Sequence, residues 1–135
     1  MTDQLTGRDL DRKLAEAMDY RAEPFTFAGA VYWQFVTARG RNVIPKLGSR
    51  SSEVAAWECC PPFSADTDAG WAAMKTVVDW MAKRYLVAIE GPSAADGFWQ
   101  CDLYRDGEIA GRSRAKSLPE ATARAALAAL GVKDA

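Results

Sequence analysis

The segment from Ser64 to Leu130 constrains the fold most, because its pattern describes a helix, three strands and a second helix in that order. A hydroxyl at Ser64 or a carboxylate at Asp66 is suited to cap the first helix, which is expected to end near Lys83. Its apolar residues recur at helical spacing. They predict an inner stripe of Trp71, Met74, Val78 and Met81.

The strands follow between the two helices. Residues 85–90 are apolar on both faces, which predicts cover on both sides. Residues 98–104 alternate, and Asp106-Gly107 predicts a tight hairpin into a third strand over 108–116. Ser117 and Glu120 match a capping box that opens a helix over 118–130, and Gly131 is suited to end it. The pattern predicts an α+β fold in which helices pack an antiparallel sheet of three to four strands.

The N-terminal part adds a helix over 7–19 and apolar residues at period two over 25–35, where Gly29 predicts a bulge or a bend into two short strands. Residues 38–52 are rich in Gly, Ser and basic side chains and predict a loop. At 135 residues, we expect a single domain over 1–135. Its core covers 61–131, its N-terminal helix 7–19, and an inserted strand and basic loop 24–57.

The composition excludes several classes of chemistry. Histidine is absent, which removes the usual Ser-His, Cys-His and His-metal arrangements, and three cysteines do not complete a zinc site. We expect no enzyme, metal or cofactor, and Cys101 as a buried small hydrophobe. No apolar run reaches 18 residues, and the N-terminus lacks the pattern of a signal peptide. The expectation is a cytoplasmic protein without a membrane partner.

Charge is polarised although the net charge is only −1. No acidic residue lies between Glu23 and Glu53, and a second basic cluster follows on the third strand. The simpler interpretation is an ordinary solvated surface; the functional one is attraction to an acidic partner. The residues are Arg39, Arg41, Lys46 and Arg50 in the loop, and Arg112, Arg114 and Lys116 on the strand.

Aromatic residues add a third candidate surface. Phe98 and Tyr104 occupy even-numbered positions, as do Gln100 and Asp102, so an alternating strand places all four on one face. We expect Arg112 and Arg114 on the same face. Aromatic rings beside arginines are able to stack on and neutralise a nucleotide. The alternative is that the N-terminal helix or the 25–35 strand covers this face and makes it core.

Three groups of residues resemble a known family. They are Gly-Arg-Asp-Leu-Asp at 7–11, Pro61-Pro62-Phe63-Ser64 with Asp66 and Trp71, and Pro119-Glu120-Ala121 with Arg124–Leu127. Together they resemble the phage αβα-sandwich domain family, over the first helix and residues 61–130. The resemblance implies a helix-sheet-helix sandwich encoded by a phage or prophage, with no catalytic residues to transfer.

We therefore expect a phage accessory protein, in the cytoplasm of the infected bacterium, that binds a host or defence protein with an acidic or nucleic-acid-related surface; a dimer is possible. One alternative is a protein that sequesters an anionic small molecule such as a signalling nucleotide, and another is a virion or morphogenesis component. The element order also matches a double-stranded RNA-binding domain. However, Glu120 stands where that family's second helix begins with lysines.

Overall fold

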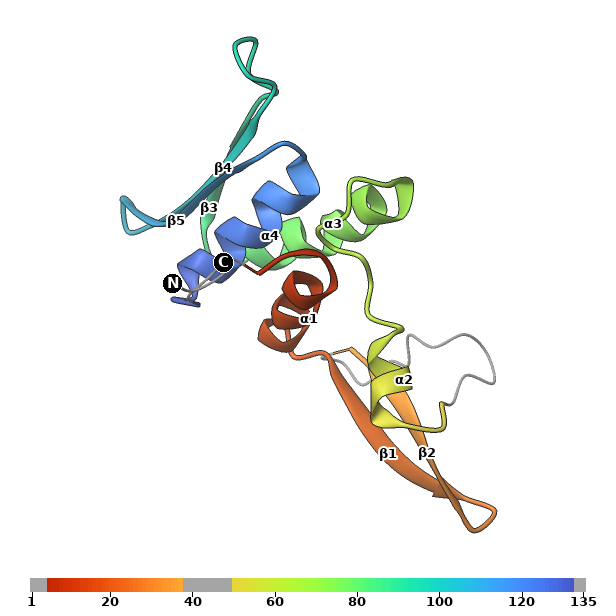
Figure 1. Ribbon diagram of the computed structural model, residues 1–135. Helices are drawn as coiled ribbons and strands as arrows, with labels where there is room; N and C mark the ends of the chain where they lie inside the picture. Colours follow the sequence, from red (N-terminus) through yellow and green to blue (C-terminus); the bar gives the residue numbers. More distant parts are fainter. Residues whose placement is uncertain (1–4, 38–49, 133–135) are drawn as a thin grey trace. The chain divides into compact units, whose positions relative to one another are not determined.

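The computed structural model describes residues 5–37 and 50–132, which form four helices and five strands (Figure 1). The chain separates into two compact units. The first contains Met1–Leu14 and Pro61–Ala135, and the second contains Ala15–Cys60. The elements are α1 (Gly7–Ala17), β1 (Arg21–Phe27), β2 (Ala30–Val36), α2 (Glu53–Trp57), α3 (Asp68–Ala82), β3 (Leu86–Glu90), β4 (Trp99–Arg105), β5 (Glu108–Ala115) and α4 (Leu118–Ala129).

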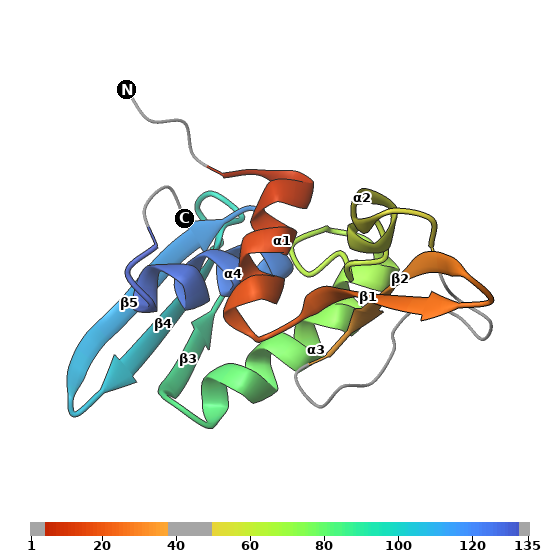
Figure 2. The same cartoon turned by 90° about the horizontal axis from the view of Figure 1, so that it is seen from below.

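The first unit is a three-stranded antiparallel sheet packed by helices. Its strand order is β3-β4-β5, and α4 packs against β4 and β5 while α3 contacts α4 and β3. Both helices lie on the same side of the sheet (Figures 1 and 2). The predicted α+β class and the antiparallel order are confirmed.

Helix α4 is the centre of this unit and is buried on nearly all sides. The Ser117 hydroxyl accepts from the Glu120 backbone N–H at 3.4 Å, as the capping box predicts. Gly131 follows the helix with a φ of 78°, the left-handed conformation expected of a helix-ending glycine. The turn at Asp106-Gly107 also has the predicted geometry, with φ values of 55° and 80°.

Helix α3 differs from its prediction. Its cap is Thr67, whose hydroxyl accepts from the Gly70 backbone N–H at 3.0 Å. Ser64 and Asp66 have other partners: Ser64 binds Asp11, and Asp66 accepts from the indole of Trp71 at 2.9 Å. The buried stripe is Gly70, Met74, Val77 and Met81. Trp71 is 37% exposed and Val78 is half-buried, so these two members of the predicted stripe were wrong.

Strand β3 also corrects an expectation. Leu86 is 73% exposed and Ile89 is 38% exposed, so the strand is not covered on both sides. The reason is its place in the sheet: β3 is an edge strand, and α3 and α4 lie on one side of the sheet only. Its apolar pattern resembles that of a central strand, but part of that apolar surface remains in water.

Helix α1 is tied to the segment before α3 by a buried carboxylate. Asp11 is 2% exposed and accepts from the backbone N–H and hydroxyl of Ser64, at 2.8 and 2.7 Å. Arg8 donates to the same carboxylate at 3.1 Å. Residues 7–11 and 61–64, which are far apart in the sequence, therefore contact each other directly.

The second unit contains the β1–β2 hairpin and α2. The predicted interruption at Gly29 is a two-residue turn, Ala28-Gly29, between two antiparallel strands. Phe35 is fully buried, with its ring 5.9 Å from that of Tyr20 and 5.0 Å from that of Trp57. Helix α2 lies outside the sequence expectations, and Ser52 caps it by accepting from Ala55 at 3.1 Å.

Candidate binding face

The side of the β3-β4-β5 sheet opposite α4 presents side chains in three cross-strand rows. We call it the open face, and it comprises Leu86, Ala88, Glu90, Gln100, Asp102, Tyr104, Ile109, Arg112 and Arg114. Strand register sets the rows, because directly paired residues of neighbouring strands point to the same side. Leu86, Tyr104 and Ile109 form the first row, Ala88, Asp102 and Arg112 the second, and Glu90, Gln100 and Arg114 the third.

The middle row is an internally paired charge network. Arg112 donates to both carboxylate oxygens of Asp102, at 2.8 and 3.3 Å, and the Gln100 amide donates to the same oxygens at 3.2 Å. Asp102 is only 7% exposed although it lies at the surface of the sheet, because these neighbours cover it. The hydrogen bonds from Arg112, followed by those from Gln100, hold the pKa of Asp102 below its usual range.

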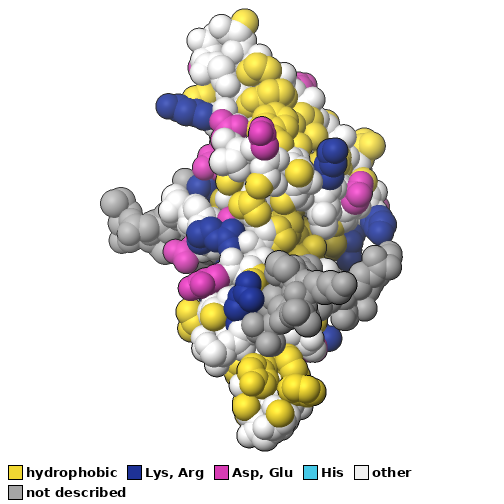
Figure 3. All heavy atoms as spheres, turned by 90° about the vertical axis from the view of Figure 1, so that its right-hand side faces the viewer, with side chains coloured by type: hydrophobic (Ala, Val, Ile, Leu, Met, Phe, Trp, Pro, Cys, Tyr) yellow, Lys and Arg dark blue, Asp and Glu magenta, His cyan; other side chains and the backbone are white. Residues whose placement is uncertain are grey.

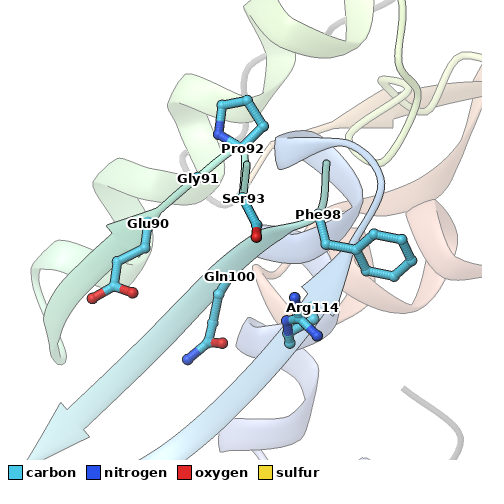
Figure 4. Close-up of a pocket in the computed structure, with 7 residues that line it drawn as sticks. All are labelled: Glu90, Gly91, Pro92, Ser93, Phe98, Gln100 and Arg114. Carbon is cyan, nitrogen blue, oxygen red and sulfur yellow. The ribbon is translucent and has the colours of Figure 1, made fainter. Parts of the chain in front are cut away.

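The third row forms the floor of a pocket of about 480 Å³ at the end of the sheet (Figure 4). Arg114 donates to Asp96 at 2.8 Å, and its guanidinium carbon lies 5.3 Å from the centre of the Phe98 ring. The backbone N–H of Phe98, followed by Arg114, lowers the pKa of Asp96. The lining residues are Glu90, Gly91, Pro92, Ser93, Phe98, Gln100 and Arg114.

The first row supplies apolar surface. Leu86 is 73% exposed and Ile109 is 47% exposed, on either side of the half-buried Tyr104. A single exposed apolar side chain is common on protein surfaces. A row of apolar side chains across three strands is less common and forms an apolar patch beside the paired charges. The open face therefore combines apolar contacts with a satisfied polar network.

The structure brings four of the predicted binding residues together. Phe98 and Arg114 lie at the pocket, and Tyr104 and Arg112 lie in the neighbouring rows. The arginines and Leu86 are exposed, so no described element of the first unit covers this face as core. Lys116 is exposed just beyond the end of β5.

The predicted basic loop does not contribute a described side chain to this face. Arg39, Arg41 and Lys46 lie outside the described residues. Arg50 belongs to the second unit, where its backbone exchanges two hydrogen bonds of 2.8 Å with Trp33. This bridge to β2 differs from the loop expected at that position.

Sequence reasoning missed the carboxylates that neutralise the strand arginines. Asp96 and Asp102 pair with Arg114 and Arg112, so the strand cluster is not the unpaired basic patch that its sequence predicts. The alternation of residues 98–104 places Asp102 on the right face, but its partner depends on the exact strand register. Leu86 and Ile109 were also missed, because an apolar residue in a strand normally predicts core.

Other chemistry finds little support in the part of the chain that the structure describes. Within residues 5–37 and 50–132, no cluster of three or more Cys, Asp or Glu side chains is suited to hold a metal ion. Cys101 is fully buried, as predicted, and burial followed by the charge of Asp102 raises its pKa to about 12. Within the same ranges, no helix has the length and apolar character needed to cross a bilayer.

The open face therefore presents an apolar row, a paired charge network and a pocket on one side of the sheet. Comparison of the chain with models of protein families, with curated proteins and with solved structures finds no match.

Proposed function

We propose that this chain is a non-catalytic binding protein that holds another protein against its open face. The observation that carries the proposal is the row of exposed Leu86 and Ile109 with the half-buried Tyr104, beside the paired Asp102–Arg112 network. Protein interfaces combine an apolar centre with polar groups whose hydrogen bonds are already satisfied. Nucleic-acid interfaces instead need cations that are available for phosphates.

The charge pairing refines the partner class. Because Arg112 and Arg114 already have carboxylate partners, the open face does not require a strongly acidic surface. The first turn of α4 gives little support to RNA binding, since Ser117 and Leu118 are each only 8% exposed. The resemblance to phage αβα-sandwich domains supports a host or defence protein in the bacterial cytoplasm as the target, and that assignment rests on the resemblance alone.

The test compares two apolar substitutions with a matched control. The double variant Leu86→Ser/Ile109→Ser removes the apolar row without opening the core, because both side chains are largely exposed. Val54→Ser is the control, since Val54 is 71% exposed but lies on α2. Proteins captured from bacterial lysate are identified by mass spectrometry, and the purified candidate is titrated by calorimetry.

We expect the double variant to weaken binding of that candidate at least tenfold, and the control to bind like the parent. Truncating central apolar contacts commonly has an effect of this size. Equal binding by the double variant and the parent contradicts the proposal.

The pocket supports a second candidate function, the sequestration of an anionic small molecule. Arg114 and Asp96 form an exposed pair, with side chains 48% and 43% exposed. Such pairs are weak, so the phosphate of a nucleotide is able to replace the Asp96 carboxylate as the partner of Arg114. The base of the same nucleotide is then able to stack on Phe98. Equilibrium dialysis against cyclic mononucleotides and cyclic dinucleotides tests this, with Arg114→Ala expected to abolish any binding. If neither class binds the parent protein, this candidate is contradicted.

A further inference from the structure

The β1–β2 hairpin ends in an exposed apolar tip, which we define as Phe27–Val31. Phe27 is 69% exposed and Val31 is 58% exposed. Phe27 pairs with Ala30, and Thr26 pairs with Val31, so the Phe27 and Val31 side chains point to opposite faces of the hairpin. The space-filling view shows hydrophobic side chains gathered at this end of the hairpin (Figure 3). The tip is therefore apolar on both faces.

The turn within the tip keeps an apolar residue where a polar one fits the backbone better. Ala28 and Gly29 both have positive φ, 53° and 80°, which is the type I′ geometry. The β4–β5 hairpin has nearly the same angles but uses Asp106-Gly107. Asp and Asn tolerate the first position, whereas alanine is disfavoured there. A purely structural turn in solvent has no need of Ala28.

The parts of the two strands next to the tip lack charge and carry aromatic side chains with polar groups. No charged residue occurs from Pro24 to Thr37. Tyr32 and Trp33 occupy the next positions along β2 and are half-buried. At about 3.4 Å per residue, Tyr32 lies about 10 Å behind the turn. Interfacial segments insert their apolar part by about 5–10 Å, and Tyr and Trp concentrate at the boundary.

The hairpin is also held in one conformation at its base. The rings of Phe25 and Tyr32 are 5.9 Å apart, and Trp33 exchanges two backbone hydrogen bonds with Arg50. Phe35 anchors the far end of β2 in the core of the second unit. A preformed tip loses little conformational entropy on insertion.

We propose that the Phe27–Val31 tip inserts into the interfacial layer of a lipid bilayer as a peripheral contact. A tip that is apolar on both faces and ends in apolar residues suits a medium that surrounds it, whereas a contact with a protein surface needs one apolar face. A two-stranded hairpin is not a closed barrel, so its insertion is confined to the interfacial layer. No spanning helix is required, and the inference departs from the sequence expectation of no membrane partner.

The experiment uses the full chain with sucrose-loaded vesicles of phosphatidylcholine, alone and with one quarter phosphatidylglycerol. We expect the parent protein to sediment with both vesicle types. The fraction of protein that sediments with the anionic vesicles should be at least as large as with phosphatidylcholine alone. Phe27→Ser/Val31→Ser should lower the apparent partition coefficient by roughly tenfold or more, because it replaces the two largest apolar side chains of the tip. Leu86→Ser/Ile109→Ser is the matched control and should sediment like the parent.

A second readout reports insertion directly. Phe27→Trp places an indole at the tip, and its emission should shift to the blue and be quenched by brominated lipid when vesicles are added. Ile109→Trp, on the strand that follows the other hairpin turn, should show neither change. Circular dichroism melts verify that the variants are folded.

Two results overturn the inference. One is equal sedimentation by the tip variant and the parent, and the other is no sedimentation of the parent with either vesicle type. In either case, a dimer in sedimentation velocity that the tip substitutions abolish assigns the tip to contact between copies. Because the protein-binding test concerns the first unit, failure of one proposal leaves the other standing.

Discussion

Replacement of Gly111 by alanine tests how closely α4 lies on the sheet. A Cβ atom at this position falls 2.5 Å from the carbonyl oxygen of Ala125 and 2.6 Å from the backbone nitrogen of Ala129. Ordinary contact needs about 3.4 Å, so α4 must move away by roughly 0.9 Å. A gap of that size forfeits a quarter to a half of the dispersion attraction across the contact.

The expected cost of Gly111→Ala is about 3 kcal/mol or more, at the upper end of overpacking effects, because the blocking atoms are backbone and cannot rotate away. For a chain of this length that corresponds to a decrease in Tm of roughly 10 °C. Thermal and urea unfolding followed by circular dichroism at 222 nm provide the measurement. Adding Ala129→Gly should not restore stability, since it removes a Cβ and leaves the backbone clash in place.

The matched control is Gly107→Ala. Gly107 has a φ of 80°, and no atom lies within 4 Å of the place that a Cβ would take, so alanine there experiences backbone strain without a clash. That strain costs about 1–2 kcal/mol. The steric argument predicts that Gly111→Ala is the more damaging change, although Gly111 does not have a positive φ. The reverse order, or a Tm for Gly111→Ala within about 3 °C of the parent, refutes the close packing.

Three further predictions follow from buried polar and thiol groups. Asp11→Ala should lower the free energy of unfolding by about 1–3 kcal/mol. Ser64→Ala should lower it by less, because the backbone N–H of residue 64 still donates to the Asp11 carboxylate. Equal losses for the two variants in chemical denaturation contradict this. The lowered pKa of Asp102 means that its ionised form stabilises the fold above about pH 4 and loses this effect as the pH falls. The difference in Tm between the parent and Asp102→Asn should therefore narrow below about pH 4, and a constant difference argues against it. Iodoacetamide at pH 8 should alkylate Cys59 well before Cys101, because Cys101 is buried and burial raises its pKa to about 12. Equal alkylation rates of the two thiols, measured by mass spectrometry, contradict this.

Local signals predicted the elements whose geometry depends on a few neighbouring residues. The capping box at Ser117, the helix end at Gly131 and the turn at Asp106-Gly107 all have the expected conformations. Each depends on hydrogen bonds or φ preferences within about four residues, which a sequence displays directly. The antiparallel order of the sheet follows from the short connections between its strands.

Signals that depend on packing partners were less informative. The apolar pattern of β3 is the same whether a second layer covers Leu86 or solvent does, so the expected cover was wrong. The buried α3 stripe is Gly70, Met74, Val77 and Met81, whereas Trp71 donates its indole N–H to Asp66. Periodicity identifies a helix, but the neighbouring element decides which of two adjacent stripes is buried.

The strand register places Arg112 and Arg114 on the face of Asp102, as expected from the sequence, but this placement depends on a single extra residue of β5. If the pairing of β4 and β5 continued from the Asp106-Gly107 turn without interruption, Gly111 would pair with Asp102. Arg112 would then point towards α4. In the structure Ala110 has no partner on β4: Tyr104 pairs with Ile109, whereas Leu103 pairs with Gly111. This irregularity moves every later residue of β5 to the other side of the sheet.

The shift has two linked consequences. Gly111, which has no side chain, lies beneath α4, where a Cβ would meet the backbone of Ala125 and Ala129. Arg112 reaches Asp102 on the open face at 2.8 Å. One extra residue in β5 thus permits close helix packing on one side and assembles the charge network on the other. The close packing of α4 and the candidate binding face therefore have one cause, because the same register shift places Arg112 beside Asp102 and Gly111 beneath Ala125.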